Sequence, residues 1–137
     1  MRSPSLDIDF WELESAEARH EAAPHSFHIP PRPTREGLRP GQHAKLLFML
    51  EGYEDDGSVG VQVERMWVTV AEVFKDGTYI GILENQPASY EPGSDLYLVR
   101  GAEVPFRPEH VIQIKNGPAQ FRKTLWLPKP VHRWPRE

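Results

Sequence analysis

Histidine is the residue type with the most scope for chemistry in this sequence, because the chain has no cysteine to act as a nucleophile or a thiolate ligand. His25 and His28 are two residues apart, a spacing that can supply two zinc ligands from one loop. A catalytic zinc usually needs three protein ligands, and the sequence nominates no third. His110 precedes a predicted strand and is expected to form a structural hydrogen bond rather than act as a base. The sequence therefore predicts no metal site and no cofactor.

Other motifs of catalysis are missing from the sequence. No Gly-x-Ser-x-Gly elbow surrounds a serine, and a hydroxyl without a strained turn and a nearby base is a weak nucleophile. There is also no phosphate-binding loop and no dinucleotide fingerprint. The acidic group Glu54, Asp55 and Asp56 lacks the ligand spacing of a calcium-binding loop and is expected to be a solvated hairpin tip. We therefore expect a protein that is not an enzyme, and a hydrolase or metal-dependent enzyme using His25, His28 or His110 ranks last.

Charge is distributed unevenly along the chain, whose formal net charge is −4. Residues 115–137 contain six Lys/Arg and one Glu, which gives +5 there and leaves −9 for residues 1–114. This basic segment also contains Phe121, Trp126 and Trp134. It is predicted to fold back on the acidic body and bury these aromatics, and the alternative is that it binds nucleic acid or another polyanion. The candidate polyanion-binding residues are Lys115, Arg122, Lys123, Lys129 and Arg133.

The elements that must position these residues are predicted to be strands. No proline occurs between Pro40 and Pro87, and proline is excluded from central strands, so the continuous part of a sheet is expected there. Ala44–Leu50 is a short apolar run, typical of a strand that is covered on both faces. In the segment 59–63 valine alternates with other residues, and the phase of the alternation changes near Glu64, which predicts a bulge at Glu64-Arg65.

A hairpin is the clearest local prediction. Asp76-Gly77 favours a type I′ turn, and we expect it to join a strand over 65–74 to a strand over 78–84. Leu96–Leu98 is predicted to be a short strand or helical turn. Two more strands are predicted over 103–106, where Pro105 indicates an edge or a bulge, and over 110–114. A helical turn that begins at Pro108 is predicted between them.

The first forty residues have a different character. Asp9 and Glu12 resemble a capping box and predict a short helix over 13–22. The proline-rich segment 28–33 is predicted to be extended. The fold class is therefore mainly β with minor α: a small bent antiparallel sheet or SH3-like barrel of five to six strands, plus a short N-terminal helix. We divide the chain into residues 1–41 (helix and strap), 42–114 (β domain) and 115–137 (basic aromatic tail packed on the domain).

Three segments resemble an uncharacterised bacterial family known only as domain of unknown function 2314, or a close relative. They are Glu64–Val70, Gly81–Pro87 and Val104–Val111, and they lie within Glu64–Ile114, a span of a little over a third of the chain. The resemblance implies a fold over Glu64–Ile114 and no established activity. Related sequences occur among proposed immunity proteins of bacterial toxin systems.

Some residues of these segments also have physical interpretations. Gly81 is expected in mid-strand, where the large side chain of Trp67 would pack over the missing side chain. Asn85 is expected at a strand exit, with its side chain bonded to nearby backbone.

We therefore expect a non-catalytic protein-binding module, of immunity type or regulatory, whose acidic body is steered toward a basic protein. Nucleic acid is disfavoured as a partner because a body at −9 repels phosphates. The chain has no apolar window of spanning length and no signal-peptide core, so a cytoplasmic protein without a membrane partner is expected. The candidate binding residues are Asn85, Tyr90, Glu109, Glu54, Asp55 and Asp56.

Overall fold

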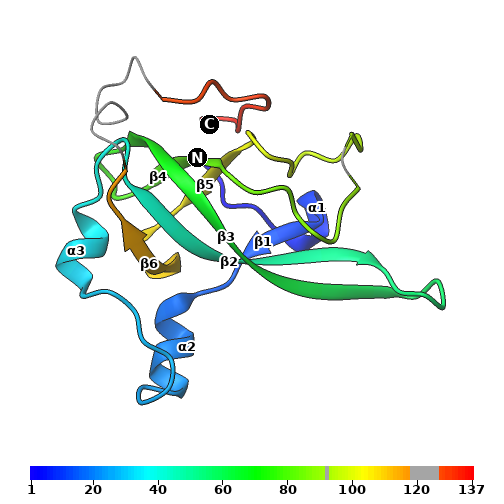
Figure 1. The fold of residues 1–137 in the computed structure, drawn as a ribbon, viewed down its shortest axis with the longest axis horizontal. Coiled ribbons are helices and arrows are strands. Elements are labelled where there is room, and N and C mark those ends of the chain that lie inside the picture. The colour runs from blue at the N-terminus through cyan, green and yellow to red at the C-terminus, as the bar shows by residue number, and fades with distance from the viewer. Residues whose placement is uncertain (92, 118–126) are drawn as a thin grey trace.

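A curled sheet of six antiparallel strands forms the body of the protein (Figure 1). The computed structural model describes residues 1–91, 93–117 and 127–137. The strands are β1 (Trp11–Leu13), β2 (His43–Tyr53), β3 (Val59–Val73), β4 (Tyr79–Leu83), β5 (Glu103–Phe106) and β6 (Val111–Lys115). The helices are α1 (Leu6–Asp9), α2 (Ala16–Ala22) and α3 (Arg32–Glu36), and η1 (Pro108–His110) is a turn of 3₁₀ helix.

The strands β2, β3, β4 and β5 are successive neighbours, and both β1 and β6 pair with the remaining edge of β2. β1 pairs with residues 48–50 of β2, whereas β6 returns after η1 to pair with residues 43–46. This return curls the sheet into a half-barrel around a core of aliphatic and aromatic side chains. The mainly β class, the curled antiparallel sheet and the number of strands predicted from the sequence are confirmed.

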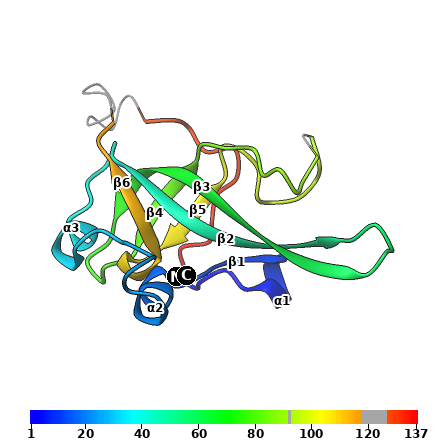
Figure 2. The ribbon, with the colours of Figure 1, turned by 60° about the horizontal axis from the view of Figure 1, so that its bottom comes forward.

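The hairpin of β2 and β3 is longer than predicted and projects from the body (Figures 1 and 2). Its register runs without a break from His43 opposite Thr69 to Tyr53 opposite Val59. The predicted bulge at Glu64-Arg65 is therefore wrong; a register shift occurs instead between Val70 and Glu72. The phase of the alternation changes because β3 leaves the core. Its distal valines, Val59, Val61 and Val63, are therefore exposed rather than buried. We call residues 51–63, the projecting part of this hairpin, the arm.

The predicted hairpin at Asp76-Gly77 is confirmed, but its turn type is wrong. Gly77 has a φ of 90°, whereas Asp76 is not in the left-handed region that a type I′ turn requires of both central residues. The amide of Gly77 donates to the carbonyl of Phe74 at 3.1 Å, and that of Phe74 donates to the carbonyl of Thr78 at 2.9 Å. This is a three-residue loop in which only the glycine needs a positive φ.

The N-terminal segment differs most from the prediction. Asp9 does not open a helix over 13–22, because Trp11 and Leu13 alternate with a polar residue and are buried as strand β1 on the edge of β2. The helix α2 begins later, where the hydroxyl of Ser15 accepts the amide of Ala18 at 3.1 Å. The segment predicted to be extended over 28–33 ends in α3, since proline is tolerated in the first turn of a helix.

Three smaller predictions concern the second half of the chain. β5 lies at the end of the strand order, so the edge position indicated by Pro105 is confirmed, and η1 is the helical turn predicted at Pro108. Leu96–Leu98 forms neither a strand nor a helical turn.

Gly81 does lie in mid-strand, but the side chain that packs over it is not Trp67. A Cβ atom at Gly81 would lie 2.6 Å from Cγ2 of Val68 and 3.2 Å from Cε1 of Phe106. Trp67 is on the opposite face of β3 from Val68, where the ammonium of Lys45 lies 5.5 Å from its ring centroid. Val68 and Phe106 are both buried in the core, so the close approach at Gly81 belongs to the packing of the half-barrel.

The helices in the described part of the chain are short, and none has the length and apolar composition needed to cross a bilayer.

Candidate binding groove

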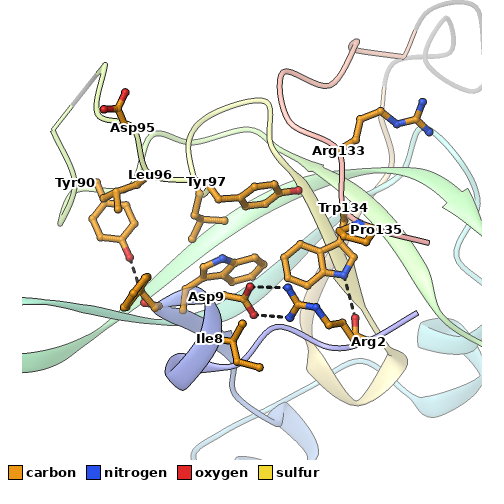
Figure 3. A pocket seen from close by; sticks show the side chains of 13 residues that line it. Arg2, Ile8, Asp9, Tyr90, Asp95, Leu96, Tyr97, Arg133, Trp134 and Pro135 are labelled. Carbon is orange, nitrogen blue, oxygen red and sulfur yellow. Dashed lines mark hydrogen bonds and ion pairs between the residues drawn. The ribbon is translucent and has the colours of Figure 1, made fainter. Parts of the chain in front are cut away.

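Two adjoining cavities lie between the N-terminal corner, the residues 89–91 and 94–98, and the base of the arm. Their volumes are about 440 Å³ and 480 Å³. They share Phe10, Tyr90 and Leu96, so we treat them as one groove with two parts. The first part, shown in Figure 3, is called the aromatic cavity, and the second is called the arm cavity.

Three aromatic rings in contact with one another form a wall of the aromatic cavity. The ring of Tyr97 lies parallel to that of Trp11, with centroids 6.2 Å apart and an interplanar angle of 2°. Trp134 meets both edge-on, at 5.7 Å from Trp11 and 5.5 Å from Tyr97. Offset-stacked and edge-on arrangements are those that the ring quadrupoles favour, so this wall is rigid.

An ion pair borders the rings (Figure 3). Both guanidinium nitrogens of Arg2 donate to the carboxylate of Asp9, at 2.7 and 2.8 Å. The hydrogen bond from Arg2 lowers the pKa of Asp9 below its ordinary value. Arg2 also lies over the ring of Trp134, 4.4 Å from its centroid, and accepts the indole N–H of Trp134 on its carbonyl oxygen at 3.0 Å. Arg2 and Asp9 therefore neutralise each other, and they leave the cavity with little net charge from this pair.

A buried carboxylate holds the C-terminal segment in place beside the cavity. Glu103, 4% exposed, accepts the amide of Trp134 at 2.9 Å and the guanidinium of Arg136 at 2.8 and 3.0 Å. Burial acts to raise the pKa of Glu103, but the hydrogen bonds from Arg136 and Trp134 outweigh it, so the pKa is below its ordinary value. Arg136 also pairs with Glu72. The position of Trp134 in the cavity wall is thus secured by charge as well as by packing.

The arm cavity extends beside Gly52, which has no side chain to fill it. Gly52 is opposite Gly60 in the β2–β3 register, and a Cβ atom at Gly52 would meet nothing within 4 Å. The space beside Gly60 is instead occupied by the carboxylate of Glu54. The walls are apolar and the remaining lining includes two carboxylates. The apolar wall residues are Phe10, Tyr53, Val59, Tyr90 and Leu96, and the carboxylates are Glu51 and Glu91.

Phe10 stands between the two cavities in a costly conformation. It has a φ of 67° and a ψ of 11°, and it is the non-glycine residue with positive φ in the described chain. Its carbonyl oxygen accepts the amide of Glu51 at 2.9 Å and the hydroxyl of Tyr90 at 3.4 Å, while its ring is 52% exposed. Backbone strain at an exposed aromatic points to a role for the ring outside the core.

Two buried polar atoms in the groove have no hydrogen-bond partner among the described residues. They are the indole nitrogen of Trp11, in the aromatic cavity, and the hydroxyl oxygen of Ser94, in the arm cavity. Buried polar atoms are nearly always satisfied, and leaving one unpaired costs about 1–3 kcal/mol. Both atoms are covered by the protein, so this cost falls on the fold itself.

The groove contains one of the predicted binding residues, and the predicted acidic group lies at the tip of the arm. Tyr90 lines both cavities, and the segment Glu54–Asp56 forms the turn that ends the arm. The hydroxyl of Ser58 holds the pKa of Asp56 below its ordinary value. Asn85 and Glu109 line neither cavity. Asn85 accepts the amide of Trp67 at 2.9 Å, which confirms its expected bond to backbone.

The residues proposed for a polyanion site are spread over several elements. Lys115 ends β6, and Lys129 and Arg133 are exposed in the C-terminal segment. Arg133 also lines the aromatic cavity and lies 3.9 Å from Glu103. Arg122 and Lys123, like the aromatic residues Phe121 and Trp126, lie outside the described residues.

The histidines show no arrangement suited to catalysis in the described ranges. His25 and His28 are exposed, and His110 accepts the amide of Arg107 at 2.9 Å within η1. Burial, with a smaller contribution from Arg107, lowers the pKa of His110 to about 4. Residues 1–91, 93–117 and 127–137 hold no group of three metal-ligating side chains.

Sequence reasoning missed most of the groove. Trp11 lies just before the helix predicted over 13–22, and Tyr97 lies in the short strand or helical turn predicted over 96–98, so neither is expected in a binding site. One signal was available, because Gly52 and Gly60 are equally spaced about the acidic tip and must pair if the tip is a tight turn. The tertiary contacts that complete the aromatic cavity have no local signal in the sequence.

Comparisons with family models, with curated proteins and with solved structures find no match to this chain. The resemblance to an uncharacterised bacterial family over Glu64–Ile114 therefore stays a prediction.

Proposed function

We propose that the protein is a non-catalytic binding module that holds a short apolar segment of a basic protein in the groove. The observation that carries the proposal is the arm cavity, an apolar hollow whose rim and neighbouring tip are acidic. An immunity-type or regulatory role would follow if the bound segment belongs to a surface that the partner needs.

The apolar character of the cavity supports an aromatic or aliphatic anchor. A volume of about 480 Å³ is within the range of ordinary ligand pockets, which are mostly apolar with a few placed polar groups. Buried aromatic anchors carry much of the energy of protein interfaces. Here the rings of Phe10 and Tyr90 would contact the anchor.

Charge supports the choice of a basic partner. The arm contains four carboxylates and no Lys or Arg, and Glu91 adds a further carboxylate beside the cavity. Complementary charge mainly increases the association rate and the discrimination between partners. Lysine or arginine residues on either side of the anchor would therefore be favoured, and acidic ones would be rejected.

The experiment uses a fluorescein-labelled peptide, Lys-Lys-Leu-Trp-Leu-Lys-Lys, and measures its binding by fluorescence anisotropy. Gly52→Val fills the arm cavity from a position where a side chain meets nothing, and its backbone is not left-handed. We expect the substitution to weaken binding about tenfold, or about 1.4 kcal/mol, with the unfolding midpoint unchanged. Gln62→Val is the matched control, because it adds the same side chain to an exposed arm position outside the cavity.

Two results would contradict the proposal. One is equal binding of the peptide by the wild-type protein and the Gly52→Val variant. The other is equal binding of a peptide in which glutamate replaces every lysine.

A further inference from the structure

The outer edge of β3 has no neighbouring strand over Val59–Val63. β4 pairs with β3 only from Val68 onward, and the described segments place no other strand beside residues 59–63. The loop after β4 reaches β3 at Glu64, whose carboxylate accepts the amides of Ala88 and Ser89 at 2.7 and 3.0 Å. The open stretch of edge thus ends where this loop begins.

The backbone groups of the three valines point to this open edge. In an antiparallel pair, successive residues direct their N–H and C=O groups alternately toward the partner strand and away from it. The amide of Glu54 donates to the carbonyl of Ser58 at 2.7 Å, which places residue 58 toward β2. Alternation then directs residues 60 and 62 toward β2, and Val59, Val61 and Val63 toward the open edge. The amide of Glu84 donates to the carbonyl of Trp67, another odd-numbered residue of β3, on the side away from β2. This bond agrees with the outward direction of Val59, Val61 and Val63.

This edge lacks the features that usually protect an edge strand. Natural proteins block such edges with charged residues, proline or bulges, because an open row of backbone donors and acceptors recruits other strands. The edge sequence Val-Gly-Val-Gln-Val has neither charge nor proline, and the register with β2 is regular throughout. The side chains of Val59, Val61 and Val63 are 59%, 48% and 49% exposed. The edge is therefore suited to receive a strand.

Charge decides between a second copy of this chain and a basic partner. Each arm carries four carboxylates and no Lys or Arg, so a second copy would approach against like charge. A strand with lysine or arginine on one face meets no such repulsion. That face would lie beside Gly60, where the carboxylate of Glu54 is placed.

We propose that the Val59–Val63 edge of β3 receives an extended segment of a basic protein as an additional antiparallel strand, with apolar residues beside the valines and cationic residues on the opposite face. The inference rests on the proposed function for the basic character of the partner, and on the open edge for the mode of binding. Val59 also lines the arm cavity, so the added strand would run beside the groove.

The first experiment measures amide hydrogen exchange in ¹⁵N-labelled protein with and without the peptide Lys-Val-Lys-Val-Lys-Val-Lys. We expect the amides of Val59, Val61 and Val63 to exchange rapidly in the free protein and at least tenfold more slowly with peptide. The amides of Gly60 and Gln62 already bond within the hairpin and should change little. Slow exchange of the three valine amides without peptide, together with a concentration-dependent dimer, would overturn the proposal in favour of self-pairing.

Backbone pairing is tested separately with N-methylated peptides. In an antiparallel addition, the peptide valines share a face with Val61 and direct their amides toward it. N-methylation of the peptide valines should therefore abolish binding, whereas N-methylation of the lysines, whose amides face away, should leave it within about twofold. Equal binding of both modified peptides would overturn the proposal.

A variant of the protein supplies the complementary test. Val61→Pro removes one outward donor and leaves the bonds to β2 in place, and edge strands tolerate proline where the N–H faces solvent. We expect it to weaken the alternating peptide at least tenfold, while Val61→Thr, which keeps the donor, stays within twofold. An equal affinity for both variants would contradict the inference. If Val61→Pro loses binding of the alternating peptide but keeps binding of the Leu-Trp-Leu peptide, the result supports the edge. The reverse pattern of binding in Gly52→Val tests the groove alone.

Discussion

The indole nitrogen of Trp134 donates a hydrogen bond to the carbonyl oxygen of Arg2, and so joins residues 132 positions apart. Arg2 in turn holds Asp9, and Glu103 holds the backbone of Trp134. The N-terminal corner and the C-terminal segment therefore stabilise each other, and the aromatic cavity exists only while both are in place.

Substitution of Trp134 should show how much this junction contributes. Trp134 is 3% exposed, and Trp134→Ala removes its ring from contact with Trp11 and Tyr97. We expect the free energy of unfolding to fall by about 3–5 kcal/mol in chemical denaturation. Val131→Ala is the control, because Val131 lies in the same segment, is largely exposed and should cost no more than about 0.5 kcal/mol. Equal stability of the two variants would show that the C-terminal segment is not part of the cooperative fold.

Gly81 tests the close packing inside the half-barrel. A Cβ atom there would lie 2.6 Å from Cγ2 of Val68, so Gly81→Ala should lower the free energy of unfolding by about 1–3 kcal/mol. Val68→Gly removes both Cγ2 and the Cβ atom that would lie 2.7 Å away, so in that background the added methyl has room and its cost should fall by about half or more. Gly52→Ala is the matched control and should be close to neutral, since nothing lies within 4 Å of the added atom. Additive effects at Gly81 and Val68 would contradict the packing.

Substitutions of Phe10 should change the stability of the protein and its binding of peptide by different amounts. Phe10→Gly relieves a left-handed conformation that costs about 1 kcal/mol in a residue with a side chain, so it should be more stable than Phe10→Ala by about that amount. Both variants lack the ring and should bind the Leu-Trp-Leu peptide at least fivefold more weakly than the wild type. Thermal unfolding and fluorescence anisotropy measure the two effects. Wild-type binding by either variant would remove Phe10 from the groove.

His110 should make the fold sensitive to mild acid. Burial lowers the pKa of His110 to about 4 in the folded protein, against an ordinary value of about 6.5. Between these values the unfolded chain binds a proton that the folded chain does not, so stability declines as the pH falls from about 6.5 to 4, by up to about 3 kcal/mol. His110→Gln, which cannot titrate, should show a smaller decline over this window in denaturant titrations. The same slope in both proteins would contradict the assignment.

The acidic tip should govern the salt dependence of peptide binding. Reversing two charges with Glu54→Lys and Asp55→Lys should weaken the lysine-rich peptides most at low ionic strength, and the difference should largely disappear at 0.5–1 M salt. Asp56 is left unchanged because it accepts the amide of Ser58 in the turn. Glu21→Lys, on the exposed face of α2, is the control for a change in net charge. An equal effect of Glu21→Lys would show that net charge, rather than the tip, attracts the peptide.

The strands of the body could be predicted because their signals are local. Alternating or continuous apolar runs bounded by turn residues indicate strands, and Asp76-Gly77 marks a hairpin whatever the rest of the chain does. The type of that turn could not be predicted, since the twist of the two strands decides whether Asp76 also needs a positive φ. The exposure of Val59, Val61 and Val63 could not be predicted either, because alternation shows which residues share a face but not whether that face is covered.

The groove depends on contacts between distant segments and was mostly hidden in the sequence. The capping-box pattern around Trp11 predicts a helix directly after it, and only pairing with the edge of β2 makes Trp11 a strand residue. Tyr90 is predicted to bind because it is polar and in a loop. Its place in the groove depends on a contact that its local sequence does not show, since the carbonyl of Phe10 accepts its hydroxyl from 80 residues away.

The arm and the body share two uninterrupted strands, since β2 runs from His43 to Tyr53 and β3 from Val59 to Val73. The arm is consequently continuous with the body, without a break in either strand between them. Tension along the arm would pull β2 and β3 together, and it would load in shear the bonds that join β2 to β1 and β6 and those that join β3 to β4. A partner that pulls on the arm would therefore meet the mechanical resistance of the whole half-barrel.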